Sequence, residues 1–253
     1  MIDSHCHLTY DKLHPHLDAV LQRAAAAGVS RMITIGTTIA DAHRTIALCK
    51  AHDNVRCAIG IHPHHSAEAT DEDLATLRQL ERDPHVLALG EMGLDYHYDF
   101  SPRDRQKHVF ITQLQLARET NRPIVIHCRE AVDDCLDILN DFPELTADFH
   151  CFTGTKDEAC RILDRGHLLG FTGILTYKRS DDLRDIARTI PSDRMLVETD
   201  APYLAPEPVR KHKSNEPSFV IHTAATLAQV RRTTIEEIDR LTTQNVQRFF
   251  RWT

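Results

Sequence analysis

Short apolar, β-branched segments alternate with longer amphipathic segments along the whole 253-residue chain, and this alternation recurs eight times. The intervening segments place leucines at helical spacing, as Leu74, Leu77 and Leu80 show. Alternation of strand and helix requires parallel strands joined by right-handed crossovers, so we predict an α/β fold. The predicted strands lie at 2–7, 32–36, 55–61, 86–91, 123–128, 147–151, 167–172 and 195–199.

Eight strand–helix units in about 250 residues fit one closed (β/α)8 TIM barrel. We predict a single domain over residues 1–253, because no linker or low-complexity tract divides the chain. An open, doubly wound sheet is the alternative fold. It is disfavoured because neither a GxGxxG nor a P-loop sequence follows the first predicted strand.

Charge and composition exclude several classes of protein. The chain has 30 Lys and Arg against 37 Asp and Glu, a net charge of −7, which argues against coating nucleic acid by charge alone. No apolar stretch reaches the roughly 18 residues of a membrane-spanning helix, and no signal peptide is predicted. Seven cysteines without a CxxC pair indicate a reducing, cytoplasmic setting. Nothing in the sequence indicates a membrane or an obligate protein partner.

Histidine is the unusual residue of this composition, with 17 copies, and it is a common metal ligand and general base. His5 and His7 are two apart in the first predicted strand, so their side chains point to the same face. In a barrel the carboxyl ends of the strands converge on one mouth, where active sites are built. Four more potential ligands stand at predicted strand ends, namely Glu91, His127, His150 and Asp200.

Each of these six residues has an ordinary explanation when taken alone, since histidines at strand ends are commonly packed and carboxylates commonly cap helices. Together, four imidazoles and two carboxylates suffice for two divalent cations with positions left open for water or substrate. The imidazoles favour Zn, Mn or iron over an all-oxygen magnesium cage, although Mg can still support turnover. Asp200 is the predicted catalytic residue, accepting a proton from the metal-activated water.

Seven segments in chain order resemble the TatD-type metal-dependent hydrolases (TatD-like deoxyribonucleases) of the amidohydrolase superfamily. They are 3–8, 60–64, 90–96, 126–131, 150–154, 198–204 and 215–217. The resemblance implies a dinuclear centre that hydrolyses phosphodiester bonds, commonly in DNA, with a metal-bound hydroxide.

The resemblance also distributes the ligands between the two ions. It assigns His5, His7, Glu91 and Asp200 to one metal, and Glu91 bridges to a second metal held by His127 and His150. Many amidohydrolases with amide substrates bridge with a modified lysine instead. The glutamate therefore favours the phosphodiesterase branch by analogy.

Three further side chains are predicted to bind substrate at the same mouth, namely His62, His64 and Arg129. The two histidines either donate hydrogen bonds to a phosphate or order the loop around Pro63. Arg129 either holds a phosphate through two hydrogen bonds or pairs with an aspartate. The basic run at 210–213 is either an electrostatic lip that attracts a polyanion or a solvated face.

Other polar residues near the predicted ligands receive structural interpretations. Strand alternation turns Cys6, Cys128 and Cys151 away from the mouth, so we expect them to be packing residues. Glu198 lies one layer below Asp200 and is expected to orient a ligand histidine.

The leading hypothesis is a metal-dependent deoxyribonuclease that trims single-stranded or frayed DNA ends, because a single metal mouth without a paired basic channel suits an end. The alternative is a metal-dependent hydrolase of small amides, esters or lactones. A non-catalytic binding module is disfavoured, since six buried ligands would then have no purpose.

Overall fold

The computed structural model describes residues 1–211 and 214–252. Eight strands are hydrogen-bonded in chain order from β1 to β8, the order expected of a (β/α)8 barrel rather than of an open doubly wound sheet. The pairs β1–β2, β3–β4, β4–β5, β5–β6 and β7–β8 are parallel. The strands are β1 (Ile2–Cys6), β2 (Arg31–Gly36), β3 (Val55–Ile59), β4 (Val86–Asp95), β5 (Ile124–Arg129), β6 (Ala147–Phe149), β7 (Leu168–Phe171) and β8 (Met195–Val197).

Helices fill the segments between the strands, and several begin at threonine caps. Thr70 and Thr155 form capping boxes with Asp73 and Glu158, which satisfy amide groups at the helix starts. The helices are α1 (Leu17–Ala26), α2 (Ile39–Ala51), α3 (Asp71–Leu80), α4 (Arg103–Thr120), α5 (Val132–Leu139), α6 (Lys156–Asp164), α7 (Asp181–Thr189), α8 (Val220–Arg231) and α9 (Ile235–Phe250). Short 3-10 helices are η1 (His14–His16), η2 (Pro63–His65), η3 (Gly173–Thr176), η4 (Ser192–Arg194) and η5 (Pro217–Phe219).

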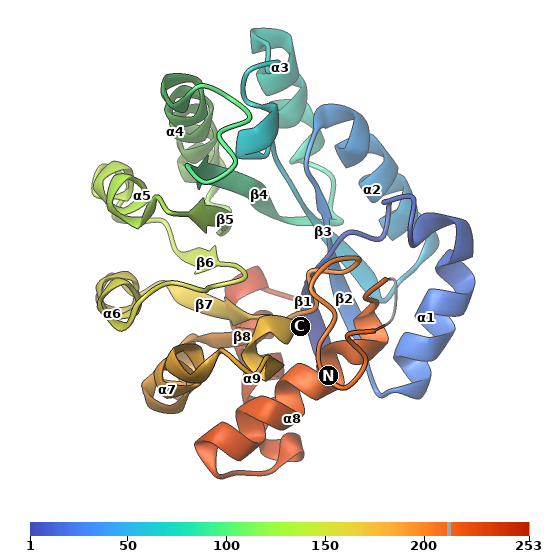
Figure 1. The fold of residues 1–253 in the computed structure, drawn as a ribbon. Coiled ribbons are helices and arrows are strands. Elements are labelled where there is room, and N and C mark those ends of the chain that lie inside the picture. Colours follow the sequence, from blue (N-terminus) through green and yellow to red (C-terminus); the bar gives the residue numbers. More distant parts are fainter. Residues whose placement is uncertain (212–213, 253) are drawn as a thin grey trace. The chain divides into compact units, whose positions relative to one another are not determined.

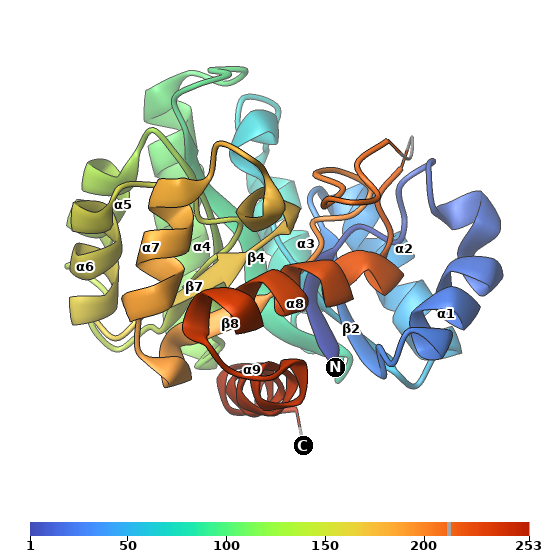
Figure 2. The ribbon, with the colours of Figure 1, turned by 60° about the horizontal axis from the view of Figure 1, so that its bottom comes forward.

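The chain divides into two compact units, which we call the terminal unit (Met1–Thr34 with Cys151–Thr253) and the central unit (Ile35–His150). In the terminal unit, α9 packs against β1 and β8 (Figure 2). The Asn245 amide of α9 donates to the carbonyls of Met195 at 2.9 Å and Ser192 at 2.8 Å, which ties the helix to the start of β8.

The central unit contains β3 to β6, with α2 to α5 lying outside these strands (Figure 1). The apolar residues of these strands are buried, as Ile59, Leu89 and Ile126 show with no exposed surface. Burial of strands on both faces is typical of parallel sheets covered by helices.

Strand β4 continues to Asp95, so the prediction that it ends at Glu91 is wrong. Its pairing with β5 shifts register between Leu89 and Met92; Gly90 lies within that step and Gly93 directly follows it. At Gly93, with φ of 136°, an added Cβ would lie 2.1 Å from the His127 carbonyl oxygen. Only glycine lets the two backbones approach this closely.

No helix in the described part of the chain combines the length and the apolar character that spanning a membrane requires.

Candidate active site

The terminal unit brings His5, His7 and Asp200 together as the first potential metal site, here called the terminal triad. The Nε2 atoms of His5 and His7 lie 3.8 and 3.3 Å from Asp200 Oδ1. Both imidazoles are buried, and each residue offers a ligand atom within 4.8 Å of the other two. These three residues come together as predicted, although Asp200 is nearly 200 positions away from the two histidines in the sequence.

Hydrogen bonds between β1 and the segment after β8 place Asp200 in this triad. The Asp200 amide donates to the His5 carbonyl at 2.9 Å. Beside it, the buried Asp3 accepts hydrogen bonds from the Thr199 amide at 2.9 Å and the Thr199 hydroxyl at 2.6 Å. Burial raises the pKa of Asp3 to about 8 despite these hydrogen bonds. Asp3 therefore acts as a buried polar link that holds Thr199 and Asp200 against β1.

The central unit forms the second potential metal site from Glu91, His127 and His150, here called the central triad. Glu91 Oε1 lies 2.8 Å from His127 Nδ1 and 2.8 Å from His150 Nε2. His62 adds a third imidazole, with Nε2 3.3 Å from the same oxygen. Burial opposes ionisation of Glu91, but the imidazoles of His150, His62 and His127 outweigh it and hold its pKa well below the usual range. Glu91 is therefore an anion ready to accept a cation.

Sequence reasoning missed Asp95, which orients two histidines of the central unit. Its Oδ2 lies 2.9 Å from His127 Nε2 and 2.8 Å from His64 Nε2. Burial opposes ionisation, but the hydrogen bonds, that from His127 foremost, hold the pKa of Asp95 below its usual range. With Nε2 held by Asp95, His127 presents Nδ1 to Glu91, the arrangement by which an outer carboxylate fixes a ligand imidazole. The available signal was the alternation that puts residues 91 and 95 on one strand face.

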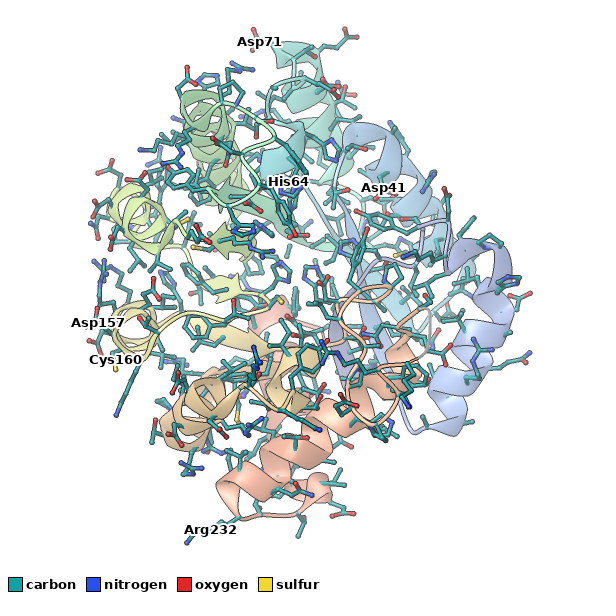
Figure 3. The ribbon with its side chains drawn as sticks, viewed as in Figure 1. Asp41, His64, Asp71, Asp157, Cys160 and Arg232 are labelled. Atoms are coloured by element: carbon teal, nitrogen blue, oxygen red, sulfur yellow. The ribbon has the colours of Figure 1, made fainter. Side chains whose placement is uncertain are left out.

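His62 and His64, the two histidines predicted to bind substrate, both interact with other side chains of the central unit. The His64 amide donates to His62 Nδ1 at 3.1 Å, which orders the loop at η2. Burial lowers the pKa of His62 to about 3, so its imidazole is neutral near pH 7. His64 lies on the strand side of α3, whereas Asp71 at the start of that helix points outward (Figure 3).

The third predicted substrate residue, Arg129, stands exposed at the end of β5. Its guanidinium carbon lies 4.7 Å from the centroid of the Tyr98 ring. Within residues 1–211 and 214–252, Arg129 makes no ion pair, so the predicted pairing with an aspartate is absent there.

Of the three cysteines expected to be packing residues, Cys6 is buried, whereas Cys128 and Cys151 are partly exposed. All seven cysteines are free, and Cys6 is fully buried with its thiol donating to the Ile33 carbonyl. Glu198 is buried and accepts hydrogen bonds from the Cys151 amide at 2.6 Å and the Ser4 hydroxyl at 3.2 Å. Glu198 thus links β1 to the segment that precedes α6.

The predicted basic lip at 210–213 falls partly outside the described residues, which omit 212 and 213. Arg210 lies 3.8 Å from a Glu207 carboxylate oxygen and 3.9 Å from the centroid of the Tyr177 ring. This arginine is therefore already paired with an acidic and an aromatic side chain.

The donor chemistry of the two triads fits divalent transition metals. Each triad supplies two imidazoles and one carboxylate, a ligand set that suits zinc, manganese or iron. Three protein ligands leave a coordination position for water or substrate, as catalytic sites require.

Comparison with known proteins decides the family. Residues 2–251 match the family model described as TatD related DNase. The chain belongs to the TatD family. It is 39% identical to the uncharacterized metal-dependent hydrolase YabD of Bacillus subtilis, over 99% of both chains. It is also 38% identical to the 3′-5′ ssDNA/RNA exonuclease TatD of Erwinia tasmaniensis, again over 99% of both chains.

A solved structure confirms the predicted fold of this TatD-family chain. The crystal structure of YJJV, a TatD homolog from Escherichia coli K12, matches it with a TM-score of 0.95 and 30% identity, over 100% of this chain and 98% of that one. The fold is a TIM barrel. The family resemblance carried by the seven segments is confirmed, and the chain is a TatD-family metal-dependent hydrolase.

Proposed function

We propose that this chain is an exonuclease that hydrolyses phosphodiester bonds at the ends of single-stranded DNA or RNA with the help of two divalent ions. The observation that carries the proposal is the presence of two triads, each with two imidazoles and a carboxylate whose ligand atoms lie within 4.8 Å of one another. A relative at 38% identity bears the name of such an exonuclease.

We assign one ion to His5, His7 and Asp200 and the other to Glu91, His127 and His150. The bridging role that the family resemblance gives Glu91 stays a prediction. Three further expectations also stay predictions: that both units form one domain, that the protein is cytoplasmic, and that it has no obligate protein partner.

Divalent ions, when bound, lower the pKa of water towards about 7 and stabilise charge on a phosphoryl group. The chain's own residues perform the remaining steps. Asp200, whose side chain is 14% exposed, accepts the proton of the attacking water as the new P–O bond forms. The P–O bond to the leaving oxygen, which stays on the shortened strand, breaks, and that oxygen takes a proton from solvent. His62, neutral and directed at Glu91, keeps that carboxylate in place.

The test combines metal analysis with end-labelled substrates. The purified protein is loaded with manganese and dialysed, and its metal content is measured. It is then offered single-stranded oligonucleotides labelled at the 5′ or the 3′ end, beside a panel of amides and lactones. We expect two ions per chain and stepwise shortening from the 3′ end. Turnover of amides or lactones with intact oligonucleotides would replace the proposal by the small-molecule alternative.

A further inference from the structure

Two aromatic rings are exposed beside the central triad. Only four large hydrophobic side chains are exposed in the part of the chain that the structure describes, and two of these are Tyr98, at 49%, and Phe100, at 65%. They stack on each other with ring centroids 5.4 Å apart and an interplanar angle of 22°. Exposed apolar side chains that adjoin one another, unlike single scattered ones, are a feature of binding surfaces.

The exposed pair is connected directly to the residues of the central triad. Phe100 packs edge-on against His64, with ring centroids 4.8 Å apart. His64 in turn shares the Asp95 carboxylate with the triad member His127. A ligand stacked on Phe100 therefore lies close to the residues that we assign to a metal ion.

The loop that carries the rings, residues 96–101, is fixed at both ends. At its start, the amides of His97 and Tyr98 donate to Asp95 Oδ1 at 3.0 and 2.9 Å. At its end, the Ser101 hydroxyl donates to the His64 carbonyl at 2.9 Å, and the Gln106 amide donates to the Ser101 carbonyl at 2.8 Å. The rings are thus held in place before a ligand arrives, which lowers the entropy lost on binding.

The charge beside the rings suits a phosphate. Arg129 lies over the Tyr98 ring and forms no ion pair within the described residues. The nearby carboxylates have their own partners, since Asp99 lies 3.7 Å from Arg103 and Glu130 lies 2.8 Å from His97. An aromatic face next to an uncompensated guanidinium is the combination that binds single-stranded nucleic acid, where bases stack and phosphates meet cations.

We propose that Tyr98 and Phe100 form a stacking platform for a nucleobase of single-stranded nucleic acid, and that Arg129 holds an adjacent phosphate. The inference rests on the proposed function and deepens it, because it names the side chains that hold a base and a phosphate of the strand. Stacking accepts every base, so the platform confers preference for bases over bare sugar-phosphate without sequence specificity.

The test pairs a protein change with a substrate change. Phe100→Leu removes the ring and keeps an apolar side chain, whereas Phe100→Trp keeps an aromatic face. Each variant is assayed with manganese on an ordinary single-stranded oligonucleotide and on one built from abasic residues, which retains the phosphates. We expect Phe100→Leu to lower kcat/KM for the ordinary strand about tenfold, as loss of one stacked base predicts, and to leave the abasic strand unchanged. Phe100→Trp should restore the difference between the two strands.

A binding measurement provides a readout other than activity. In the presence of a chelator, a strand ending in 2-aminopurine should lose fluorescence on wild-type protein and on Phe100→Trp, but not on Phe100→Leu. Ile235→Ala, which removes another exposed apolar side chain at the start of α9, is the matched control and should behave as wild type.

The outcomes separate the two proposals. Equal turnover of ordinary strands by wild type and Phe100→Leu, with unchanged quenching, overturns the platform and leaves the exonuclease standing. A wild-type protein that neither binds nor shortens either strand overturns the exonuclease, and the platform with it.

Discussion

At the scale of single residues, Asp95 holds the central triad in order through contacts on both of its carboxylate oxygens. One oxygen receives the imidazoles of His64 and His127, and the other receives backbone amides of the following loop. Loss of this carboxylate frees the His127 ring to rotate away from Glu91.

We therefore expect Asp95→Ala to weaken manganese binding at the central triad about 10- to 100-fold, the usual effect of removing a carboxylate that orients a ligand histidine. Isothermal titration with manganese measures the change. Asp95→Asn, which retains one acceptor oxygen, should lie between wild type and Asp95→Ala. Unaltered affinity in Asp95→Ala would show that His127 needs no such support.

Asp200 is expected to serve in catalysis more than in metal retention. Asp200→Asn keeps an oxygen beside His5 and His7 but cannot accept the proton of the attacking water, so kcat should fall at least about 100-fold. Metal analysis of the same sample should show most of the manganese still present. Full activity in this variant would remove Asp200 from the role of proton acceptor.

The candidate ligand residues were visible in the sequence because histidines and carboxylates stand out at the ends of the predicted apolar strands. Glu91, His127 and His150 come together as predicted within the central unit, as do His5, His7 and Asp200 within the terminal unit. The role of Asp3 was not visible, since it depends on contacts with Thr199 that only the folded chain creates. For Asp95 the sequence offered only its place on the same strand face as Glu91, and its contacts with His64 and His127 exist only in the folded chain.

At the scale of elements, β4 shows where sequence patterns fail. The continuous apolar run of residues 86–89 stops just before Glu91, so the pattern predicted a strand end there. The strand instead continues to Asp95, because Gly90 and Gly93 let its backbone pass close to β5. Close packing of two backbones leaves no hydrophobic signal, and its only trace in the sequence is the glycines.

Gly93→Ala tests this close approach. The new methyl group would meet the His127 carbonyl at 2.1 Å in a backbone conformation that favours glycine, so we expect a loss of at least about 3 kcal/mol in the free energy of unfolding. Urea denaturation followed by circular dichroism measures it. Gly166→Ala is the matched control, since φ there is also positive, at 79°, but no atom lies within 4 Å, and it should cost only about 1 kcal/mol. Equal losses in the two variants would contradict the steric explanation.

At the scale of the whole molecule, the buried His167, which directly precedes β7, makes stability depend on pH. Burial, with a smaller contribution from Arg165, lowers its pKa to about 4. In the unfolded chain the same imidazole titrates near its ordinary value of about 6.5. As the pH falls, this imidazole therefore takes up a proton in the unfolded chain before it does so in the folded chain. The stability that His167 contributes is complete above pH 6.5 and is lost progressively as the pH falls towards 4.

Between pH 7.5 and pH 5 this single group should account for about 2 kcal/mol of lost stability. His167→Leu should flatten that part of the stability profile in denaturant titrations at several pH values. The same substitution at His108, an exposed residue of α4, should leave the slope as in wild type. A slope unaffected by His167→Leu would mean that the pKa of His167 is the same in the folded and the unfolded chain.

Because the chain divides in this way, the two triads are completed at different points of translation. The central unit is one uninterrupted stretch, Ile35–His150, whereas the terminal unit is made from both ends of the chain. Glu91, His127 and His150 are all translated before Asp200 exists. A nascent polypeptide therefore carries all three residues of the central triad before the aspartate that we assign to catalysis has been translated.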